Sequence, residues 1–234
     1  MKTRIAAMLL PGFLLLTLLS FAQKDEHKLV EFHMAFLKLG PKWESTKEEE
    51  RETILKQHQV TVLAMLKSGK AIIVSSIGRE RDRVVIFILR ASSAAEAKAW
   101  VDADSAVKAG LYTAEMHPWW SEDIFKKPNS PLGVETVYLG FLKKGPNRKE
   151  GDAEIPEVQQ MQKDHIANIE RLARLGKLVV AGPFGDDGEL RGIFVFRVAS
   201  LKEAEQLAAT DPMIKIDRLR LELHEWKVPA GVIP

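Results

Sequence analysis

The 234-residue sequence contains no cysteine, and this absence removes several kinds of chemistry at once. Without a thiol the chain can form no disulfide framework, no thiolate nucleophile, no cysteine-ligated metal site and no lipid anchor on cysteine. An excess of charge is also lacking, because 34 lysines and arginines face 32 aspartates and glutamates. The two extra positive charges, Lys2 and Arg4, lie in a segment that we expect to be removed. A near-neutral protein has no net field that attracts nucleic acid, so none is expected as a partner.

Long apolar runs are missing after the first 22 residues, as are the common motifs of nucleotide and ester chemistry. No later segment approaches the roughly 20 apolar residues that cross a bilayer. No P-loop, dinucleotide fingerprint or GxSxG elbow occurs. His27 and His33 lie near each other without a carboxylate triad, so we predict no metal site and no cofactor. With 46% hydrophobic and 28% charged residues, the chain has an ordinary globular composition that can bury a core.

The first 22 residues resemble an export signal. A short basic start precedes an apolar stretch from Ile5, and Ser20 and Ala22 place small residues before a cleavage point. An uncleaved membrane anchor is the alternative, but the apolar stretch is too short to favour it. We therefore expect an exported protein, periplasmic or secreted, that begins near Gln23 and has no stable membrane insertion after cleavage.

The rest of the chain contains two copies of one sequence pattern. An offset of 107 residues aligns residues 56–119 with the later sequence without a gap, and it pairs His58 with His165 and Asp104 with Asp211. Such repetition marks one structural unit that is used twice. We expect a signal peptide over residues 1–22, a first domain over 27–122, a linker over 123–133 and a second domain over 134–228.

Each copy shows the same order of elements. In the second copy, β-rich segments predict strands, helical spacing of apolar residues predicts a helix that Gly176 ends, and a capping box at Ser200 opens another helix. Asp211-Pro212 is expected to end that helix. The predicted elements are a strand over 135–143, a helix over 156–175, strands over 177–181 and 192–198, a helix from residue 200, and a strand over 218–226. The order is βαββαβ, the ferredoxin-like arrangement.

A ferredoxin-like unit has both helices on one face of its sheet and leaves the other face bare. In the last strand of each copy, His117 and Trp119, or His224 and Trp226, point away from the apolar residues that face the helices. A sheet face that carries tryptophan is expected to be buried against another surface, and the equivalent sheet face of the other copy can provide that surface. The sequence thus predicts an α+β fold in which tandem ferredoxin-like (βαββαβ) repeats form an intramolecular pseudo-dimeric α+β barrel. A monomer is sufficient for this arrangement. A homodimer is an alternative, because the edge strands of the sheets remain free to pair with another chain.

The second copy carries four short motifs: DHIA at residues 164–167, GKLVVAGPF at 176–184, DPM at 211–213 and ELHEW at 222–226. Together they resemble the YCII-related family of small dimeric α+β barrel proteins, over residues 135–226 and more loosely over 29–119. The resemblance implies a ferredoxin-like fold, a barrel-like pairing of two sheets, and a histidine and an aspartate with an enzymatic role. These two residues map to His165 and Asp211.

His58 and Asp104 occupy the matching places in the first copy. There, Ser75-Ser76 stands in place of Gly182-Pro183, and Ser105 in place of Pro212. This departure from the pattern distinguishes the first copy from the second.

Two interpretations of the histidine–aspartate pairs remain open from the residues alone. His165 lies four residues from both Met161 and Ile169, on the apolar face of the predicted helix, where a histidine can simply be a satisfied core group. The aspartate can likewise only cap a turn. Alternatively, the aspartate orients the imidazole and supports its cationic form, which makes a general acid–base group for neutral pH. The separation of 46 residues in both copies favours the pair, although common descent also preserves it.

Candidate ligand-binding residues lie on the face between the two predicted sheets. His117, Trp119, His224 and Trp226 either line a pocket there or fill the interface. Gly182-Pro183 either lets backbone approach a ligand or makes a hairpin turn.

Two classes of function follow. The first is an enzyme that uses His165 with Asp211, and in the first copy His58 with Asp104, for proton transfer on a small organic molecule, as an isomerase, lyase or hydrolase. The second is a non-catalytic module that binds a small ligand or a partner, with structural histidines. A haem-binding barrel would require an inward histidine beside an open apolar pocket.

Overall fold

The computed structural model describes residues 28–78, 82–127 and 133–234. The predicted signal peptide lies outside the described residues, so export stays a prediction. Among the described residues, no helix combines the length and apolar character needed to cross a bilayer.

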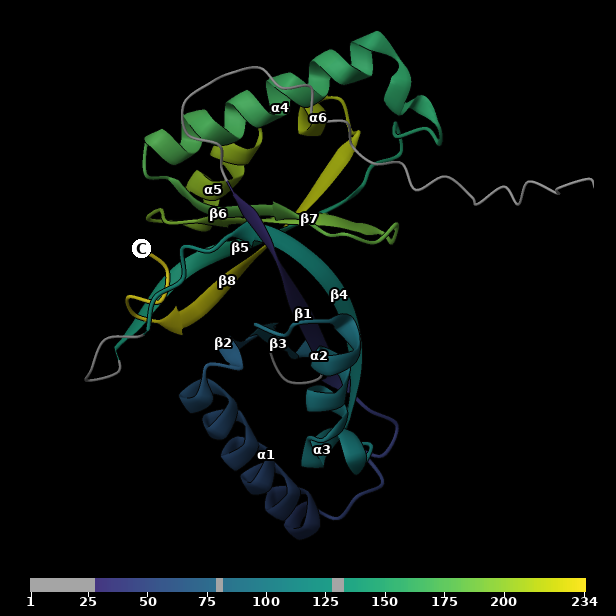
Figure 1. The fold of residues 1–234 in the computed structure, drawn as a ribbon, viewed down its shortest axis with the longest axis vertical. Coiled ribbons are helices and arrows are strands. Elements are labelled where there is room, and N and C mark those ends of the chain that lie inside the picture. The colour runs from purple at the N-terminus through teal and green to yellow at the C-terminus, as the bar shows by residue number, and fades with distance from the viewer. Residues whose placement is uncertain (1–27, 79–81, 128–132) are drawn as a thin grey trace, which may run out of the picture.

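Two four-stranded antiparallel sheets form the centre of the molecule, and helices cover the outer face of each (Figure 1). In the first half the strand order is β2-β3-β1-β4, and in the second half it is β6-β7-β5-β8. The first half consists of β1 (Leu29–Leu39), α1 (Glu48–Ser68), β2 (Ala71–Ile77), β3 (Val84–Leu89), α2 (Ala94–Asp102), α3 (Ser105–Lys108) and β4 (Tyr112–Glu122). The second half consists of β5 (Val134–Lys144), the 3-10 turn η2 (Asp152–Glu154), α4 (Pro156–Arg174), β6 (Leu178–Pro183), β7 (Leu190–Phe196), α5 (Leu201–Ala208), α6 (Pro212–Lys215) and β8 (Leu219–Pro229).

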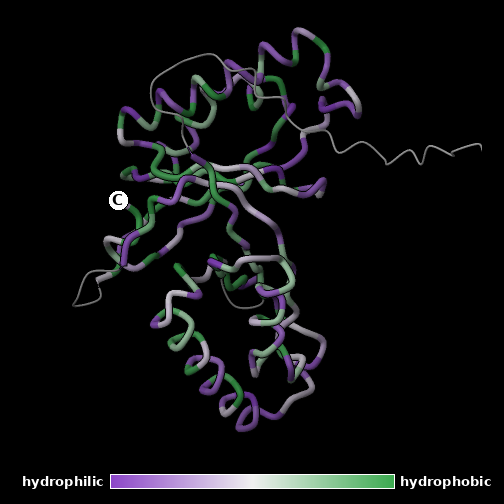
Figure 2. Tube along the Cα trace, viewed as in Figure 1, coloured by the Kyte–Doolittle hydropathy of each residue, from purple (hydrophilic) through white to green (hydrophobic). Residues whose placement is uncertain are grey.

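Alternation along the strands divides the apolar side chains among three cores. In β1, Phe32, Met34 and Phe36 face the other sheet, whereas Ala35 and Leu37 face the helices. One core therefore lies between the two sheets and contains residues of both halves. The other two lie between each sheet and its own helices. Figure 2 shows the hydrophobic strand segments gathered at the centre of the molecule.

The two sheets are joined along their edges as well as through this core. The N–H of Gly185, after β6, donates to the oxygen of Pro118 in β4 at 2.8 Å. On the other side, Oγ of Ser75 in β2 donates to the oxygen of Lys227 in β8. These contacts close the predicted intramolecular barrel, and the α+β fold class of tandem ferredoxin-like repeats is confirmed.

One local prediction was wrong, and one of two open interpretations of another motif is excluded. Asp211-Pro212 does not end the second helix, because α5 already stops at Ala208; instead Pro212 begins the short helix α6. Proline is favoured at the first helical position, where its missing N–H has no partner to lose. Gly182-Pro183 forms the end of β6 and not the hairpin turn, which follows it.

Candidate functional site

Two histidine–aspartate pairs occupy equivalent places in the two halves. In the second half, Nδ1 of His165 on α4 lies 2.6 Å from Oδ2 of Asp211, which precedes α6. In the first half, the same atoms of His58 on α1 and Asp104 before α3 are 2.8 Å apart. His165 is 8% exposed and Asp211 is fully buried. The structure thus brings together the residues of each predicted pair, while their catalytic role remains a prediction.

Each aspartate uses its second carboxylate oxygen to cap a short helix. Oδ1 of Asp211 accepts the backbone N–H groups of Met213 at 2.9 Å and Ile214 at 3.4 Å. Asp104 caps α3 through the equivalent two amides. An ionised aspartate can only accept hydrogen bonds, so in this arrangement the histidine Nδ1 is the donor. One side chain therefore both orients an imidazole and caps a helix.

The nitrogen of each imidazole that the aspartate does not hold is Nε2. Among the described residues, nothing hydrogen-bonds to Nε2 of His58 or His165, and these atoms are not sealed from solvent as the ring nitrogens of His33 are. In this tautomer Nε2 can accept a proton, and the neighbouring carboxylate stabilises the imidazolium that forms. Each pair can therefore take up a proton and return it.

The surroundings of the two histidines differ. The ring of His58 lies 5.6 Å from the ring of Tyr112 and 6.4 Å from that of Phe87. Burial raises the pKa of Tyr112, and the charge of Asp104 adds to this against the opposing charge of Arg83. The second half has no counterpart of this tyrosine, because Leu219 takes its place in β8.

His165 instead stacks on Phe194, with ring centroids 6.0 Å apart and planes inclined by 22°. Three polar side chains that the sequence did not single out follow His165 on α4 or precede Asp211, and we call Asn168, Arg171 and Thr210 the polar trio. Nη2 of Arg171 donates to Oδ1 of Asn168 at 2.8 Å and to Oγ1 of Thr210 at 2.9 Å. Thr210 directly precedes Asp211.

Two signals in the sequence point to the polar trio in retrospect. Asn168 follows His165 by three residues, a spacing that places both on one helix face. The repeat also breaks at all three positions, where the first copy has Thr61, Ala64 and Ala103.

Trp119 and Trp226 lie in the core between the sheets, 0% and 1% exposed. Nε1 of Trp119 donates to the oxygen of Gly182 at 3.2 Å. A Cβ atom added to Gly182 would lie 2.0 Å from the oxygen of Trp120, so this glycine permits a close approach of the two halves. Pro183 follows it in β6. These predicted ligand-binding residues therefore contact protein of the other half or lie next to residues that do.

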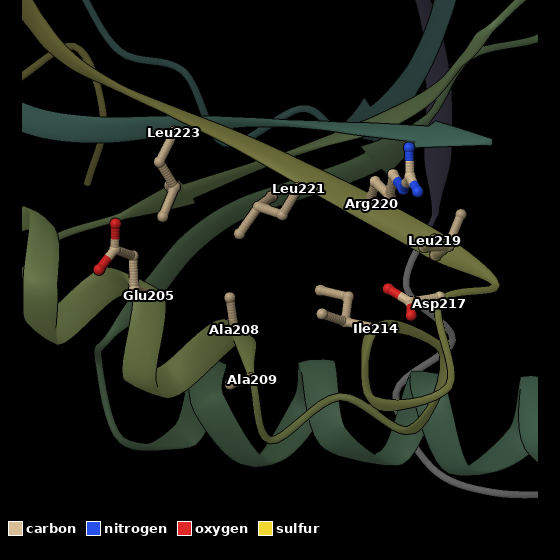
Figure 3. A pocket seen from close by; sticks show the side chains of 9 residues that line it. All are labelled: Glu205, Ala208, Ala209, Ile214, Asp217, Leu219, Arg220, Leu221 and Leu223. Atoms are coloured by element: carbon tan, nitrogen blue, oxygen red, sulfur yellow. The ribbon is translucent and has the colours of Figure 1, made fainter. Parts of the chain in front are cut away.

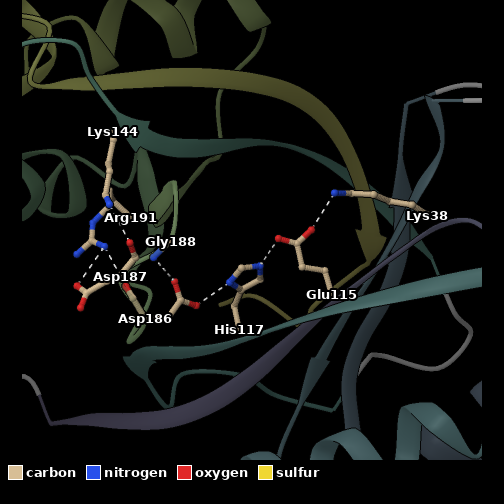
Figure 4. A network of polar contacts seen from close by, with 8 residues as sticks. All are labelled: Lys38, Glu115, His117, Lys144, Asp186, Asp187, Gly188 and Arg191. Atoms are coloured by element: carbon tan, nitrogen blue, oxygen red, sulfur yellow. Dashed lines mark hydrogen bonds and ion pairs between the residues drawn. The ribbon is translucent and has the colours of Figure 1, made fainter.

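His117 forms a polar network across the two halves (Figure 4). Its Nδ1 lies 2.7 Å from Oδ2 of Asp186 in the turn after β6, and its Nε2 lies 3.0 Å from Oε1 of Glu115. Both nitrogens face carboxylates, and the ring donates to both of them only in its imidazolium form. Lys38 also binds Glu115, at 2.8 Å.

The carboxyl groups of this network are stabilised in their charged forms. The Lys38 hydrogen bond is the largest cause that lowers the pKa of Glu115, and His117 adds to it against partial burial. Burial by itself would raise the pKa of Asp186, but the hydrogen bonds from His117 and the Gly188 N–H, together with nearby positive charge, outweigh it and lower this pKa. The network therefore links the halves through opposite charges.

His224 occupies the place of His117 in β8. Its Nε2 lies 2.8 Å from Oε1 of Glu222, and Lys143 binds the other oxygen of this carboxylate. His224 is a quarter exposed and, among the described residues, forms no hydrogen bond or ion pair with the first half, so the two equivalent histidines differ in their surroundings.

An open cavity of about 410 Å³ lies between β8 and the helices α5 and α6 (Figure 3). Its lining residues are Glu205, Ala208, Ala209, Ile214, Asp217, Leu219, Arg220, Leu221 and Leu223. None of the predicted site residues is among them. Within residues 28–78, 82–127 and 133–234, no group of three or more histidine or acidic side chains is arranged to hold a metal ion.

The model of the YCII-related domain matches residues 138–227. Residues 138–227 form a YCII-related domain. This YCII-related domain contains His165, Asp211 and the polar trio. A second domain of this kind in the first half stays a prediction.

Solved structures that resemble the chain share its fold at low sequence identity. A chlorite dismutase variant from Candidatus Nitrospira defluvii has a TM-score of 0.57 and 14% identity, over 87% of this chain and 92% of that one. A heme-binding protein from Thermus thermophilus has a TM-score of 0.51 and 15% identity, over 86% and 92%. No curated protein matches the chain. The likeness at this identity establishes the barrel fold of the chain and nothing further.

Proposed function

We propose that this protein is an enzyme in which His165 and Asp211 act as a general acid–base pair on a small organic molecule. The observation that carries the proposal is the 2.6 Å contact from His165 Nδ1 to a buried carboxylate, together with an Nε2 atom that has no hydrogen-bond partner among the described residues. This arrangement suits proton transfer at neutral pH, because the carboxylate holds the imidazole in one tautomer and stabilises its protonated form. Isomerisation, elimination and hydrolysis all use such a group.

The second carboxylate oxygen keeps the pair in this geometry. Asp211 cannot rotate away from His165 without losing the N–H groups of Met213 and Ile214 at the start of α6. During the reaction, Nε2 takes a proton from the substrate, the imidazolium stays paired with Asp211, and the same nitrogen returns the proton. Pre-organised donors and acceptors of this kind need little rearrangement in the transition state.

Haem does not fit this site as it stands. An imidazole whose Nδ1 is held by a carboxylate suits a metal ligand in principle. However, Phe194 and the fully buried Leu172 pack in the layer around His165, and the 410 Å³ cavity contains no histidine in its lining. A macrocycle needs an apolar cavity beside the nitrogen, so no step is assigned to it.

A non-catalytic binding or structural module is the second candidate. It is favoured by the helix-capping contact that both Asp104 and Asp211 make, because this contact alone accounts for an aspartate in both halves. We also propose that the protein acts after export, on the basis of the N-terminal segment alone.

The test is proton exchange from carbon in D2O. Small carbonyl compounds are incubated with the protein, and loss of their acidic C–H signals is followed by NMR. We expect catalysed exchange that is lost in His165→Gln and Asp211→Asn and kept in His58→Gln, which removes the equivalent imidazole from the first half. Exchange that persists in His165→Gln would refute the acid–base role.

A further inference from the structure

We infer that Arg171 and Asn168 recognise the carboxylate group of an anionic organic substrate beside His165. The inference rests on the proposed function for the place of that substrate, but anion binding itself requires no catalysis. It is carried by a positive charge without a counter-ion, a buried donor without an acceptor, and the restriction of both to the second half.

Arg171 carries a charge that no acid neutralises within the described part of the chain. Its Nη2 donates only to neutral oxygens, those of Asn168 and Thr210. Three residues further along α4, Arg174 instead pairs with Glu170 at 3.6 Å. A guanidinium has five donors in one plane, so the N–H groups of Nη1 and Nε remain free. Because these two nitrogens point to opposite sides of the plane, only one of them donates to a given carboxylate, and the Asn168 amide is left for its second oxygen.

Asn168 supplies the second observation. It is 9% exposed, and its Nδ2 is buried without an acceptor. The hydrogen bond from Arg171 holds Oδ1, so the amide cannot rotate to exchange its two ends. A buried donor without a partner destabilises the free protein, and an oxygen brought by a ligand relieves this loss. The same side chain therefore positions Arg171, and its buried Nδ2 is a donor that a ligand oxygen reaches only once the groups covering it move apart.

The nearby acids do not compete for Arg171. Asp211 is occupied by His165 and by two backbone amides. Asp164 accepts from Gln160 at 2.9 Å on the exposed side of α4. Arg171 is exposed, so water and a negatively charged ligand are the remaining partners for its guanidinium.

A carboxylate fits this charge better than a phosphate does. The site offers one guanidinium and one amide, which match one negative charge shared by two oxygens. A phosphate carries up to two charges and three acceptor oxygens, for which the site supplies too few donors.

The first half is an internal control. At the three equivalent positions it has Thr61, Ala64 and Ala103, none of which carries a charge or an amide. His58 thus keeps its aspartate but lacks anion recognition, and we expect carboxylate binding in the second half only.

The test is an NMR titration of the purified protein with sodium acetate at constant ionic strength, with acetamide as the neutral counterpart. We expect acetate, but not acetamide, to shift the Nε–H signal of Arg171 and the side-chain amide of Asn168 with one shared dissociation constant. Arg171→Gln should weaken acetate binding about tenfold or more, because a charge-assisted hydrogen bond is lost. Arg171→Lys keeps the charge without the planar donors, so its affinity for acetate should lie between those of the wild type and Arg171→Gln.

The matched control is Arg174→Gln, which removes an exposed arginine of the same helix that is already paired. It should bind acetate as the wild type does. Equal shifts of Arg171 and Arg174, equal binding of acetamide, or no saturable shift would overturn the inference. Tighter binding of inorganic phosphate than of acetate would overturn the assigned ligand class.

The two proposals fail separately. If acetate binds through Arg171 while C–H exchange does not depend on His165, the acid–base function is wrong and the anion site stands. If exchange depends on His165 while acetate binding does not depend on Arg171, the anion site is wrong and the acid–base function stands.

Discussion

Replacing Asp211 by asparagine and by alanine separates the two tasks of this side chain. Asparagine keeps Oδ1, so the amides of Met213 and Ile214 retain their acceptor at 2.9 and 3.4 Å. Its Nδ2 then faces Nδ1 of His165 and donates to it, because the reverse orientation would set an NH2 group against two backbone N–H donors. The imidazole is forced into the tautomer with a proton on Nε2, and the neutral base is lost.

Alanine removes both contacts. The lost helix cap costs about 1 kcal/mol and the buried Nδ1 left without a partner about 1–3 kcal/mol, so we expect about 2–4 kcal/mol for Asp211→Ala. At roughly 2–4 °C per kcal/mol for a protein of this size, the melting temperature falls by about 5–15 °C. Asp211→Asn should cost about 1 kcal/mol or less, since the cap survives.

Thermal unfolding measures the stability, and 15N NMR of the imidazole reports the tautomer. Asp104→Asn and Asp104→Ala, the matched variants of the first half, should show the same order of stability without affecting exchange at His165. The reasoning is refuted if Asp211→Asn is as unstable as Asp211→Ala, or if its His165 keeps the proton on Nδ1.

Three further predictions concern the rest of the molecule. Gly182→Ala should destabilise the protein by about 2 kcal/mol or more, because its Cβ meets backbone of the other half; an unchanged urea midpoint would contradict this. The Arg218 hydrogen bond lowers the pKa of Asp152 from 3.8 to about 2, and a carboxyl with a lowered folded-state pKa loses its stabilising contribution as the pH falls through this range. As the pH falls from about 4 to 2, the free energy of urea unfolding should therefore decrease more steeply in the wild type than in Asp152→Asn. The same pH dependence in both proteins would contradict this prediction. His117→Phe should raise the pKa of Asp186 toward its ordinary value, and an unchanged carboxyl titration by NMR would show that His117 does not set it.

The strands and the direction of their side chains could be predicted from the sequence because side chains along a strand alternate between the two faces of its sheet. The alternation in β8 assigned Leu219 to the helices and Trp226 to the face between the sheets, and both lie there. A ferredoxin-like sheet with one bare face and a second copy of itself leaves few ways to bury tryptophan. The global arrangement followed from that constraint.

Short elements and close contacts were beyond the same reasoning. The helix α6 has four residues, too few for a period, and a proline such as Pro212 signals the end of one helix as readily as the start of the next. Gly182 carries no local sign that the backbone of Trp120 passes beside it, because that contact comes from the other half of the chain. Such features depend on how the halves meet, which no single segment encodes.

The polar trio also bears on which of the two pairs performs chemistry. Both pairs keep the histidine, the aspartate and the helix cap, so selection for folding alone accounts for what the two halves share. Both imidazoles lie against a phenylalanine ring, but His58 also lies against Tyr112, whereas the second half carries the exposed Arg171 guanidinium and the unpaired Asn168 amide. A buried unpaired donor such as Asn168 Nδ2 reduces stability, whereas the exposed guanidinium of Arg171 is solvated. A cost that folding does not explain, present in one copy and absent from its duplicate, is the pattern expected where one half retained a binding site and the other became a scaffold.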